Sequence, residues 1–176
     1  MLLDLGKIRV PHTSVEEVYG PRAFRDSEEA YRIAEPVSLR FEVLKTDARY
    51  RLTGHVQTVL ELPCSRCLES FFLPIDAGFD LLYFPQSKNV GEGELEVEEE
   101  DMSVAFYDNS EIDLGQLMRE QFYLALPMKP LCAEECRGLC PTCGINLNRA
   151  VCECRRDWID PRLAVLKAIK DDTMSS

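Results

Sequence analysis

Apolar and polar residues alternate along three segments of the chain, at about 37–43, 50–62 and 71–83. This period of two is the pattern of strands with one buried face, and the short connections between them predict an antiparallel sheet covered on one side. Gly54 falls on the apolar face of the second segment, which indicates a bulge or a close packing contact. A further short strand is predicted near 102–107. These segments predict a mainly β core.

The hydrophobic period changes to that of an α-helix in the region after residue 113. One helical stripe holds the apolar residues Leu114, Leu117, Met118, Phe122 and Ala125. Asp113 and Gln116 have the spacing of a capping box, and Pro127 ends the run. We expect this helix to cover the sheet. A second helix is predicted over 160–170, where an Asp-Pro pair supplies an N-cap and a proline at the first helical position.

Two other regions have weaker patterns. An early strand is predicted at Leu2–Val10, and the polar stretch at 14–34 is expected to hold a short helix or a long connection. The cysteine-rich insert at 131–154 has too few apolar residues to fold around a core of its own, so it needs a staple.

Eight cysteines occur as four close pairs and are the strongest chemical signal in the chain. In chain order the pairs are Cys64 and Cys67, Cys132 and Cys136, Cys140 and Cys143, and Cys152 and Cys154. A Cys-x-x-Cys turn, a helical spacing of four and an extended spacing of two can each direct two thiolates toward one ion. Eight thiolates make two tetrahedral four-cysteine zinc sites with none left over. All eight are therefore predicted to be ligands of two structural zinc ions.

The four pairs can be combined in more than one way. Our preferred partition joins the third pair with the fourth, and the first pair with the second, which would connect the turn between two strands to the end of the first helix. The alternative joins the second pair with the third and leaves the two distant pairs together. Both partitions stay open from the sequence alone.

Other thiol chemistry was compared with structural zinc. A thioredoxin-like redox pair at Cys64 and Cys67 would need a βαβ context, whereas its flanks are predicted strands. An iron–sulfur cluster is compatible with four thiolates, and spacing does not exclude it. A catalytic zinc usually recruits histidine or a carboxylate, but the two histidines, His12 and His55, lie outside the cysteine groups. Structural zinc is the preferred interpretation, and His55 is expected to be an exposed strand residue.

Charge argues against a general nucleic-acid binder, because the formal net charge is −11. Seven acidic residues fall within 92–101, a segment expected to be a solvated loop or an exposed strand edge. The span 127–170 holds eight basic and five acidic residues, a local balance of +3. The arginines beside the cysteines either neutralise the negative charge of a four-thiolate zinc site or form a small basic patch for RNA or a protein partner. They are Arg66, Arg137, Arg149, Arg155 and Arg156.

Several classes of function receive no support. No apolar run reaches the roughly 18 residues of a membrane helix, and the first ten residues lack the layout of a signal peptide. The expected compartment is the cytoplasm, where thiols stay reduced. The chain has no glycine-rich phosphate loop and no Ser-His-Asp set, so no catalytic residue is predicted.

The order of several motifs resembles that of the YceD-like family over about residues 1–170. The motifs are Cys64-Ser-Arg-Cys67-Leu68, Glu111-Ile-Asp-Leu114, Leu126-Pro-Met-Lys-Pro-Leu-Cys132, Cys136-Arg-Gly-Leu-Cys140-Pro-Thr-Cys143-Gly144-x-Asn146-Leu-Asn148 and Asp160-Pro-Arg-Leu-Ala-Val-Leu166. The resemblance implies a cytoplasmic ribosome-biogenesis factor linked to accumulation of the large-subunit (23S) ribosomal RNA, not an enzyme. Some relatives lack the last cysteine cluster, which implies that this cluster is a self-contained site.

Together these observations predict an α+β fold with a mostly antiparallel β-sheet, a covering helix and a zinc-stapled C-terminal module. We expect a β-rich core with its helix at 1–130, and the cysteine-rich module with the second helix at 131–170. The expected function is a non-catalytic zinc-binding factor for 23S rRNA accumulation or processing. Its expected partner is ribosomal RNA or a ribosome-assembly protein, with no DNA and no membrane. The alternative is a thiol- or metal-dependent enzyme of the cytoplasm.

Overall fold

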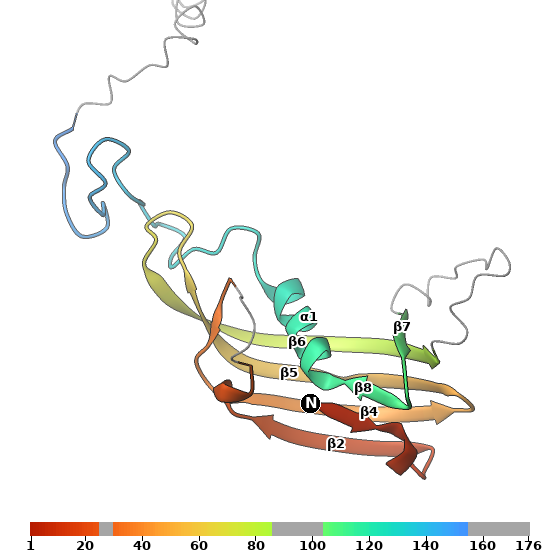
Figure 1. Ribbon diagram of the computed structural model, residues 1–176. Coiled ribbons are helices and arrows are strands. Elements are labelled where there is room, and N and C mark those ends of the chain that lie inside the picture. Colours follow the sequence, from red (N-terminus) through yellow and green to blue (C-terminus); the bar gives the residue numbers. More distant parts are fainter. Residues whose placement is uncertain (25–29, 86–103, 155–176) are drawn as a thin grey trace, which may run out of the picture.

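The structure, a computed structural model, describes residues 1–24, 30–85 and 104–154 (Figure 1). The elements are, in chain order, β1 (Leu2–Asp4), the 3-10 turn η1 (Leu5–Lys7), β2 (His12–Tyr19), the 3-10 turn η2 (Pro21–Phe24), β3 (Arg32–Ile33), β4 (Val37–Thr46), β5 (Arg49–Pro63), β6 (Ser70–Pro85), β7 (Val104–Tyr107), β8 (Glu111–Asp113) and α1 (Leu114–Ala125). The predicted helix at 160–170 and the acidic run at 92–101 lie outside the described residues.

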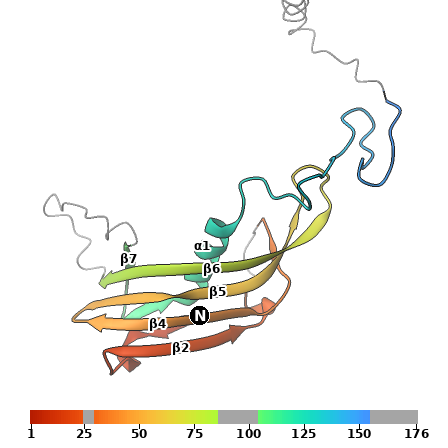
Figure 2. The same ribbon diagram turned by 180° about the vertical axis from the view of Figure 1, so that it is seen from behind.

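The main sheet is a mostly antiparallel one, as the sequence predicted. Its strand order is β2-β4-β5-β6-β7, with β3 paired to β5 as well. The β6–β7 pair is parallel, and the other pairs are antiparallel. β1 and β8 form a separate two-stranded sheet. α1 and this small sheet lie on one face of the main sheet, while the opposite face is bare in the view from behind (Figures 1 and 2).

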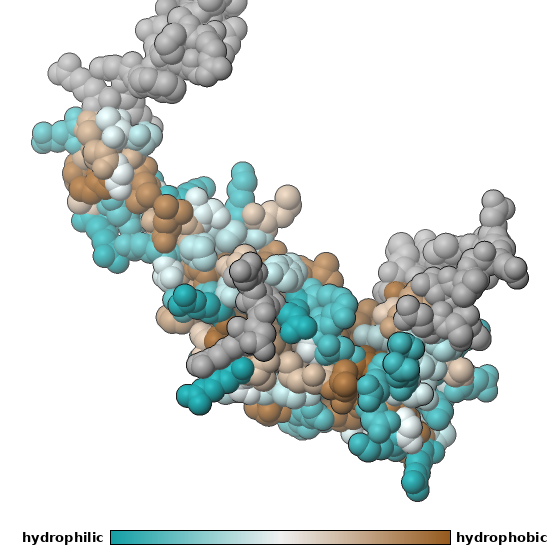
Figure 3. All heavy atoms as spheres, in the orientation of Figure 1, coloured by the Kyte–Doolittle hydropathy of each residue, from teal (hydrophilic) through white to brown (hydrophobic). Residues whose placement is uncertain are grey.

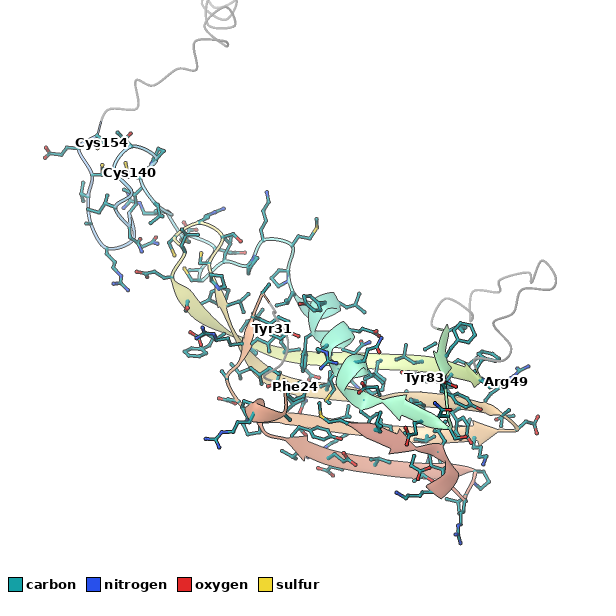
Figure 4. All side chains as sticks on the ribbon, in the orientation of Figure 1. Phe24, Tyr31, Arg49, Tyr83, Cys140 and Cys154 are labelled. Carbon is teal, nitrogen blue, oxygen red and sulfur yellow. The ribbon has the colours of Figure 1, made fainter. Side chains whose placement is uncertain are left out.

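The core lies between the main sheet and α1. Inward-facing residues of β4 and β5 are almost completely buried, including Val37, Leu39, Val43, Leu52 and Val56. This agrees with the alternation in the sequence, because in each strand every second side chain points to the same face. From α1, Phe122 packs against two aromatic residues labelled in Figure 4, with ring centroids 6.3 Å from Phe24 and 5.9 Å from Tyr31.

Gly54 lies in a regular part of the sheet and not in a bulge. It pairs with Phe41 on β4 and Phe79 on β6 without a break in register. A Cβ atom at this position would lie 2.2 Å from the carbonyl oxygen of Arg40 and 2.5 Å from Cβ of Phe41. Of the two explanations that the sequence left open, close packing is therefore the right one.

α1 begins and ends where the pattern predicted. The Asp113 side chain accepts hydrogen bonds from the backbone N–H groups of Gly115 and Gln116, at 2.8 and 3.2 Å. The Gln116 side chain donates to Glu120 at 2.8 Å. The N-cap is therefore confirmed. The capping box is not completed, because the Gln116 side chain bonds to Glu120, one helical turn further along, and not back to Asp113. The first residue of the chain also holds this end, since Leu114 N donates to Met1 O at 2.8 Å.

The N-terminal region differs from its prediction. The strand expected at Leu2–Val10 is confined to β1, because the Asp4 side chain accepts from Gly6 N at 2.9 Å and caps the 3-10 turn that follows. The polar stretch at 14–34, expected to be a helix or a long connection, contains most of strand β2. β2 lies at the edge of the sheet, and its inward-facing residues are only half-buried, so they give a weak hydrophobic pattern.

The bare face of the main sheet carries exposed cross-strand pairs of opposite charge or of histidine and carboxylate. The pairs are Arg40 with Glu16, Arg51 with Asp80, His12 with Glu42, and His55 with Asp76. His55 is thus an exposed strand residue, as predicted. Along the described ranges, no helix is both long enough and apolar enough to cross a membrane.

Candidate metal centres

The eight cysteines gather in two groups of four. Centre 1 is defined by Cys64, Cys67, Cys132 and Cys136, and centre 2 by Cys140, Cys143, Cys152 and Cys154. Within each group all four Sγ atoms lie within 4.8 Å of one another. This is the partition that the sequence analysis preferred. Both centres lie beyond the end of the sheet, and Cys140 and Cys154 mark centre 2 on an arm that projects away from it (Figure 4).

The sulfur spacing fits a tetrahedral metal site. In centre 1, the Sγ atoms of Cys64 and Cys136 are 3.7 Å apart, as are those of Cys67 and Cys132. In centre 2, Cys152 Sγ lies 3.5 Å from Cys143 Sγ and 3.4 Å from Cys140 Sγ. Tetrahedral zinc with Zn–S bonds of ~2.3 Å would place its sulfur atoms roughly 3.8 Å apart. The donor atoms therefore need only small movements to hold such an ion.

The hairpin between β5 and β6 forms the first half of centre 1. Leu68 N donates to Cys64 O, and Cys64 N donates to Glu69 O, both at 2.9 Å. Arg66 N points to Cys64 Sγ at 3.5 Å. Leu68 takes the left-handed conformation, with φ of 62°, to close this turn. The turn thus presents two sulfur atoms and an N–H group that stabilises one of them.

The first half of centre 2 repeats this turn bond for bond. Gly144 N donates to Cys140 O, and Cys140 N donates to Ile145 O, again at 2.9 Å. Thr142 N points to Cys140 Sγ at 3.4 Å. Gly144 occupies the position that corresponds to Leu68 and has φ of 74°. The two Cys-x-x-Cys segments therefore fold as the same turn, and each places two sulfur atoms where a metal ion could be held.

The second half of centre 1 is a loop, which corrects an expectation. Cys132 and Cys136 were expected to share a helical turn, but α1 ends at Ala125 and both lie in irregular chain. Cys136 N donates to Ala133 O at 3.0 Å, which supplies the turn. Two prolines between the helix and this loop lack the N–H groups that would continue the helix, so the chain leaves it.

Several hydrogen bonds join the hairpin to this loop. Ser65 N donates to Pro130 O at 2.8 Å. The Arg66 side chain donates to the carbonyl oxygens of Glu134 and Cys136 at 3.1 and 2.9 Å. Arg66 therefore supports the fold of centre 1, a role that differs from both of those that the sequence left open for the arginines beside the cysteines.

Two more of these arginines are described in the structure. Arg149 pairs with Glu69 at 2.9 Å, so centre 2 is tied to the hairpin of centre 1. The backbone N–H of Arg137 donates to Asn148 Oδ1 at 2.7 Å. Arg155 and Arg156 lie outside the described residues. Of the described arginines, Arg149 therefore links the two centres through its side chain and Arg137 only through its backbone. A basic patch for RNA or a protein partner stays a prediction.

The two centres differ in exposure. Cys64, Cys67 and Cys136 are buried and pack with the half-buried Phe71 and Leu131. In centre 2 only Cys140 is buried, and Cys143 and Cys154 are exposed. On the face of the arm that Figure 3 shows, apolar residues gather along the middle and polar residues lie at its sides. Centre 1 is thus part of a small hydrophobic core. In centre 2, by contrast, the cysteines themselves make up most of what the arm buries.

In each of the two matching turns, the first thiol is favoured as a thiolate. Burial acts to raise the pKa of Cys64, but backbone N–H groups around its sulfur outweigh burial and lower the pKa to about 6. The backbone N–H groups of Cys143 and Thr142 lower the pKa of Cys140 to about 6 as well. These two sulfur atoms begin the two matching turns. Each turn is therefore prepared to offer a negative ligand near neutral pH.

One thiol of each group, Cys132 in centre 1 and Cys154 in centre 2, is strongly disfavoured as a thiolate when no cation is present. The side chain of Cys136 raises the pKa of Cys132 to about 12. Likewise, the side chain of Cys152 raises the pKa of Cys154 to about 12. A divalent cation between the sulfur atoms would replace this repulsion by attraction, because it stabilises every coordinating thiolate. The donor set therefore fits a metal such as zinc better than it fits four free thiols.

Two other uses of the cysteines, a thioredoxin-like redox pair and a catalytic zinc, lack the surroundings that are typical of them. Cys64 and Cys67 lie on a hairpin between two antiparallel strands and not at the start of a helix, which is where a thioredoxin-like pair gains its low thiol pKa. Within the described ranges, the chain offers only cysteine to either group, so no histidine or carboxylate marks a catalytic zinc. Four thiolates remain compatible with an iron–sulfur cluster.

Asn148 joins the two centres, a contact that the sequence did not predict. Asn148 stands in the motif after Cys143, yet no role was assigned to it. Its Nδ2 atom lies 3.3 Å from Cys136 Sγ, so a residue from the loop of centre 2 contacts a ligand of centre 1. The sequence feature that could have indicated this contact is the pair of asparagines in a cysteine-rich loop, because short amide side chains often bond to the backbone of nearby turns.

Comparison with known proteins relates the chain to one family. Residues 52–170 match the family described as "Large ribosomal RNA subunit accumulation protein YceD". This span includes all eight cysteines. No solved structure matches the chain.

Individual relatives come from plants and bacteria. "Large ribosomal RNA subunit accumulation protein YCED homolog 1, chloroplastic" of Arabidopsis thaliana is 29% identical over 162 residues, which is 80% of this chain and 50% of the relative. An uncharacterised protein of Mycobacterium tuberculosis is 34% identical over 116 residues, 65% of this chain and 53% of its own length. Protein YlbN of Bacillus subtilis is 28% identical over 117 residues, 65% of this chain and 63% of YlbN. The chain thus spans about half the length of the first of these relatives.

Proposed function

The chain belongs to the YceD family of large ribosomal RNA subunit accumulation proteins, and we propose that it supports accumulation of the large-subunit (23S) ribosomal RNA as a non-catalytic factor. The observation that carries this proposal is the family match, which covers both cysteine centres. The names of the plant relatives state the same role for those proteins. We propose the cytoplasm as the compartment, although the plant relatives are named as chloroplast proteins.

We propose that centres 1 and 2 each hold one structural zinc ion. The sulfur spacing and the all-cysteine donor sets support zinc, and the matching turns support the same role at both centres. When bound, the metal supplies a cross-link between segments that have little apolar surface with which to hold each other. In small zinc-finger peptides such a site contributes on the order of 10 kcal/mol to folding. The residues around the sulfur atoms complete each site, because their N–H groups orient and stabilise the thiolates.

We propose a ribosome-assembly protein as the direct partner. The net charge of −11 opposes close approach to the phosphate backbone of RNA. On the bare face of the sheet, Arg40 is paired with Glu16 and Arg51 with Asp80, so these basic side chains are already matched to acidic ones. A protein partner needs no surplus of basic residues. Direct contact with ribosomal RNA is the other outcome that the experiment below distinguishes.

Gradient sedimentation tests the proposed role. Tagged chain is expressed from its own gene, the lysate is sedimented through sucrose, and the fractions are probed for the tag and for both ribosomal RNAs. We expect the chain in fractions that contain precursors of the large subunit, and a fall in the ratio of large- to small-subunit RNA when the gene is deleted. Ribonuclease treatment followed by crosslinking then separates a protein contact from an RNA contact. A chain that sediments alone, with an unchanged RNA ratio after deletion, would refute the proposal.

A metal and thiol count separates the proposed factor from the alternative enzyme. The purified chain should carry two zinc ions, measured by inductively coupled plasma mass spectrometry, and its thiols should react with a disulfide reagent only after denaturation. One labile metal, or a thiol pair that cycles under a mild oxidant, would instead support a thiol- or metal-dependent enzyme.

A further inference from the structure

Asn148 connects the two centres. It lies in the loop between Cys143 and Cys152, whose sulfurs belong to centre 2, but its Nδ2 lies 3.3 Å from the sulfur of Cys136 in centre 1. We propose that Asn148 is a positioning residue that couples metal binding at centre 1 to the folding of the loop at centre 2. The inference rests on the proposed function, since it assumes that both centres hold metal.

The orientation of the amide follows from its two partners. The backbone N–H of Arg137 is only a donor, so the atom that faces it at 2.7 Å must be the acceptor Oδ1. The NH₂ group of Asn148 therefore faces Cys136 Sγ and donates to it. An N–H group that donates to a coordinating thiolate fixes the direction of the sulfur and stabilises its negative charge.

The position of Asn148 depends on the loop of centre 2. Its backbone N–H donates to Asn146 Oδ1 at 2.9 Å, and the neighbouring Leu147 N donates to Gly138 O at 2.9 Å. The loop is anchored at both ends by cysteines of centre 2, namely Cys143 and Cys152. If centre 2 loses its metal, these anchors are released, and the donor to Cys136 loses its support.

The segment that connects the two centres is short and closely packed. Three residues, 137–139, separate the last ligand of centre 1 from the first ligand of centre 2. Gly138 has φ of 72°, and a Cβ atom there would lie 3.0 Å from Arg66 O. Leu139 N also donates to Arg66 O at 3.2 Å. The segment is thus packed against the hairpin of centre 1, so a disturbance at one centre reaches the other.

Coupling of this kind is reciprocal by thermodynamic necessity. Metal at centre 2 strengthens the hold on metal at centre 1, and metal at centre 1 supports the loop of centre 2 by the same factor. The chain is therefore expected to load and lose its two ions with positive cooperativity, and Asn148 is the contact through which most of that cooperativity passes.

Two substitutions at this position separate metal positioning from a role in loop structure alone. Asn148→Asp keeps an acceptor for the N–H of Arg137 but removes the donor to Cys136 and places a negative charge beside the thiolate. Asn148→Ala removes both bonds and adds no charge. We expect Asn148→Asp to weaken zinc binding at centre 1 by 10- to 100-fold, and Asn148→Ala to weaken it less. If Asn148 served only the loop, Asn148→Ala, which adds no charge, would bind zinc at centre 1 like the wild type, and the proposal would be overturned.

A double-mutant comparison tests the coupling itself. Cys154 is the exposed last ligand of centre 2, so Cys154→Ser should empty centre 2 with little damage to the rest of the fold. In the wild-type background we expect this change to weaken centre 1 by about tenfold. In the Asn148→Ala background it should have almost no further effect on centre 1. Equal effects of Cys154→Ser in both backgrounds would contradict the role of Asn148.

The measurements are made on the full chain with zinc or cobalt alone as the probe. Transfer of zinc to a chromophoric chelator gives the affinities, and the cobalt absorption spectrum checks that each remaining site is tetrahedral and thiolate-bound. Asn109→Asp, on the turn before β8, adds the same charge away from the cysteines and should leave zinc affinity unchanged. A wild-type chain without metal would refute the zinc centres and the coupling together, whereas two bound ions with no effect at Asn148 would refute the coupling alone.

Discussion

Two corresponding residues of the matching cysteine turns carry very different side chains. Leu68 and Gly144 both have positive φ, at 62° and 74°, but only glycine adopts this conformation without a steric penalty. Leu68→Gly should therefore stabilise the chain by up to about 1 kcal/mol, because the side chain is largely exposed and little packing is lost. Gly144→Ala should destabilise it by about 1 kcal/mol. Thermal unfolding of the zinc-loaded chain measures both changes.

The pair of substitutions contains its own control. No atom lies within 4 Å of a Cβ added at Gly144, so a loss of stability there reports on backbone conformation and not on a clash. Opposite signs at the two positions are the expected result. The same sign at both would show that the two turns do not share one backbone requirement.

A single carboxylate on the bare face of the sheet gives a pH-dependent prediction. The Arg51 side chain donates to Asp80, and this hydrogen bond holds the pKa of Asp80 below its ordinary value. A lowered pKa in the folded state stabilises the fold above the ordinary pKa, and that stabilisation is lost as pH falls through the lowered value. Asp80→Asn should thus be less stable than wild type at pH 7, and the difference should close at pH values below about 4.

Urea unfolding at several pH values measures this difference. In an Arg51→Ala background the effect of Asp80→Asn should nearly disappear, since the partner that lowers the pKa is gone. A difference that persists unchanged at low pH would mean that Asp80 acts through packing and not through its charge.

At the scale of elements, the contact between β4 and β5 depends on the absence of a side chain. A methyl group at Gly54 would lie 2.2 Å from a backbone oxygen of β4, which cannot rotate away as a side chain can. Gly54→Ala should therefore destabilise the sheet by about 3 kcal/mol, measured by chemical denaturation. Gly20→Ala is the matched control, because among the described residues, its two chain neighbours aside, no atom lies within 4 Å of its added Cβ. A neutral Gly54→Ala would mean that the strands separate at little cost.

Most elements that the sequence predicted have one face buried over many residues, and the short strand predicted near 102–107 is also present, as β7. β4, β5, β6 and α1 each repeat an apolar position often enough to show a period. β2 was missed because an edge strand buries too little to show one. The pairing of β1 with β8 joins residues more than a hundred positions apart, and local pattern carries no information about such contacts.

The cysteine groups were predictable for a different reason. Spacing of two to four residues limits which thiols can meet, and the preferred partition agrees with the observed groups. That all eight bind metal stays a prediction. Asn148 and the pairing of Arg149 with Glu69 could not be derived, because both join loops that are distant in the sequence or that have no periodic structure.

At the scale of the whole molecule, the two centres are expected to have separate effects on stability. Cys64→Ser opens centre 1, which joins the β5–β6 hairpin to the segment after α1, so we expect a loss of about 4 kcal/mol and a melting temperature lower by about 10 °C. Cys152→Ser should mainly release the arm at 140–154. Hydrogen exchange should show lost protection at the hairpin and at the segment after α1 in the first variant, and chiefly within the arm in the second. The reverse pattern would contradict this division.

The distance along the chain between the halves of centre 1 has a consequence for synthesis. Cys132 follows Cys67 by 65 residues, so at about 5–20 residues per second the ribosome needs roughly 3–13 s to make the second half after the first. During that interval the hairpin thiols are exposed to oxidation with no partner pair to hold a metal. The ligands of centre 2 span only 140–154 and are made within roughly 3 s or less. If Asn148 couples the centres, centre 1 reaches its full affinity for metal only after Asn148 and the cysteines of centre 2 have been made. The hairpin thiols, which are synthesised first, are therefore the last to be fully protected by a bound metal.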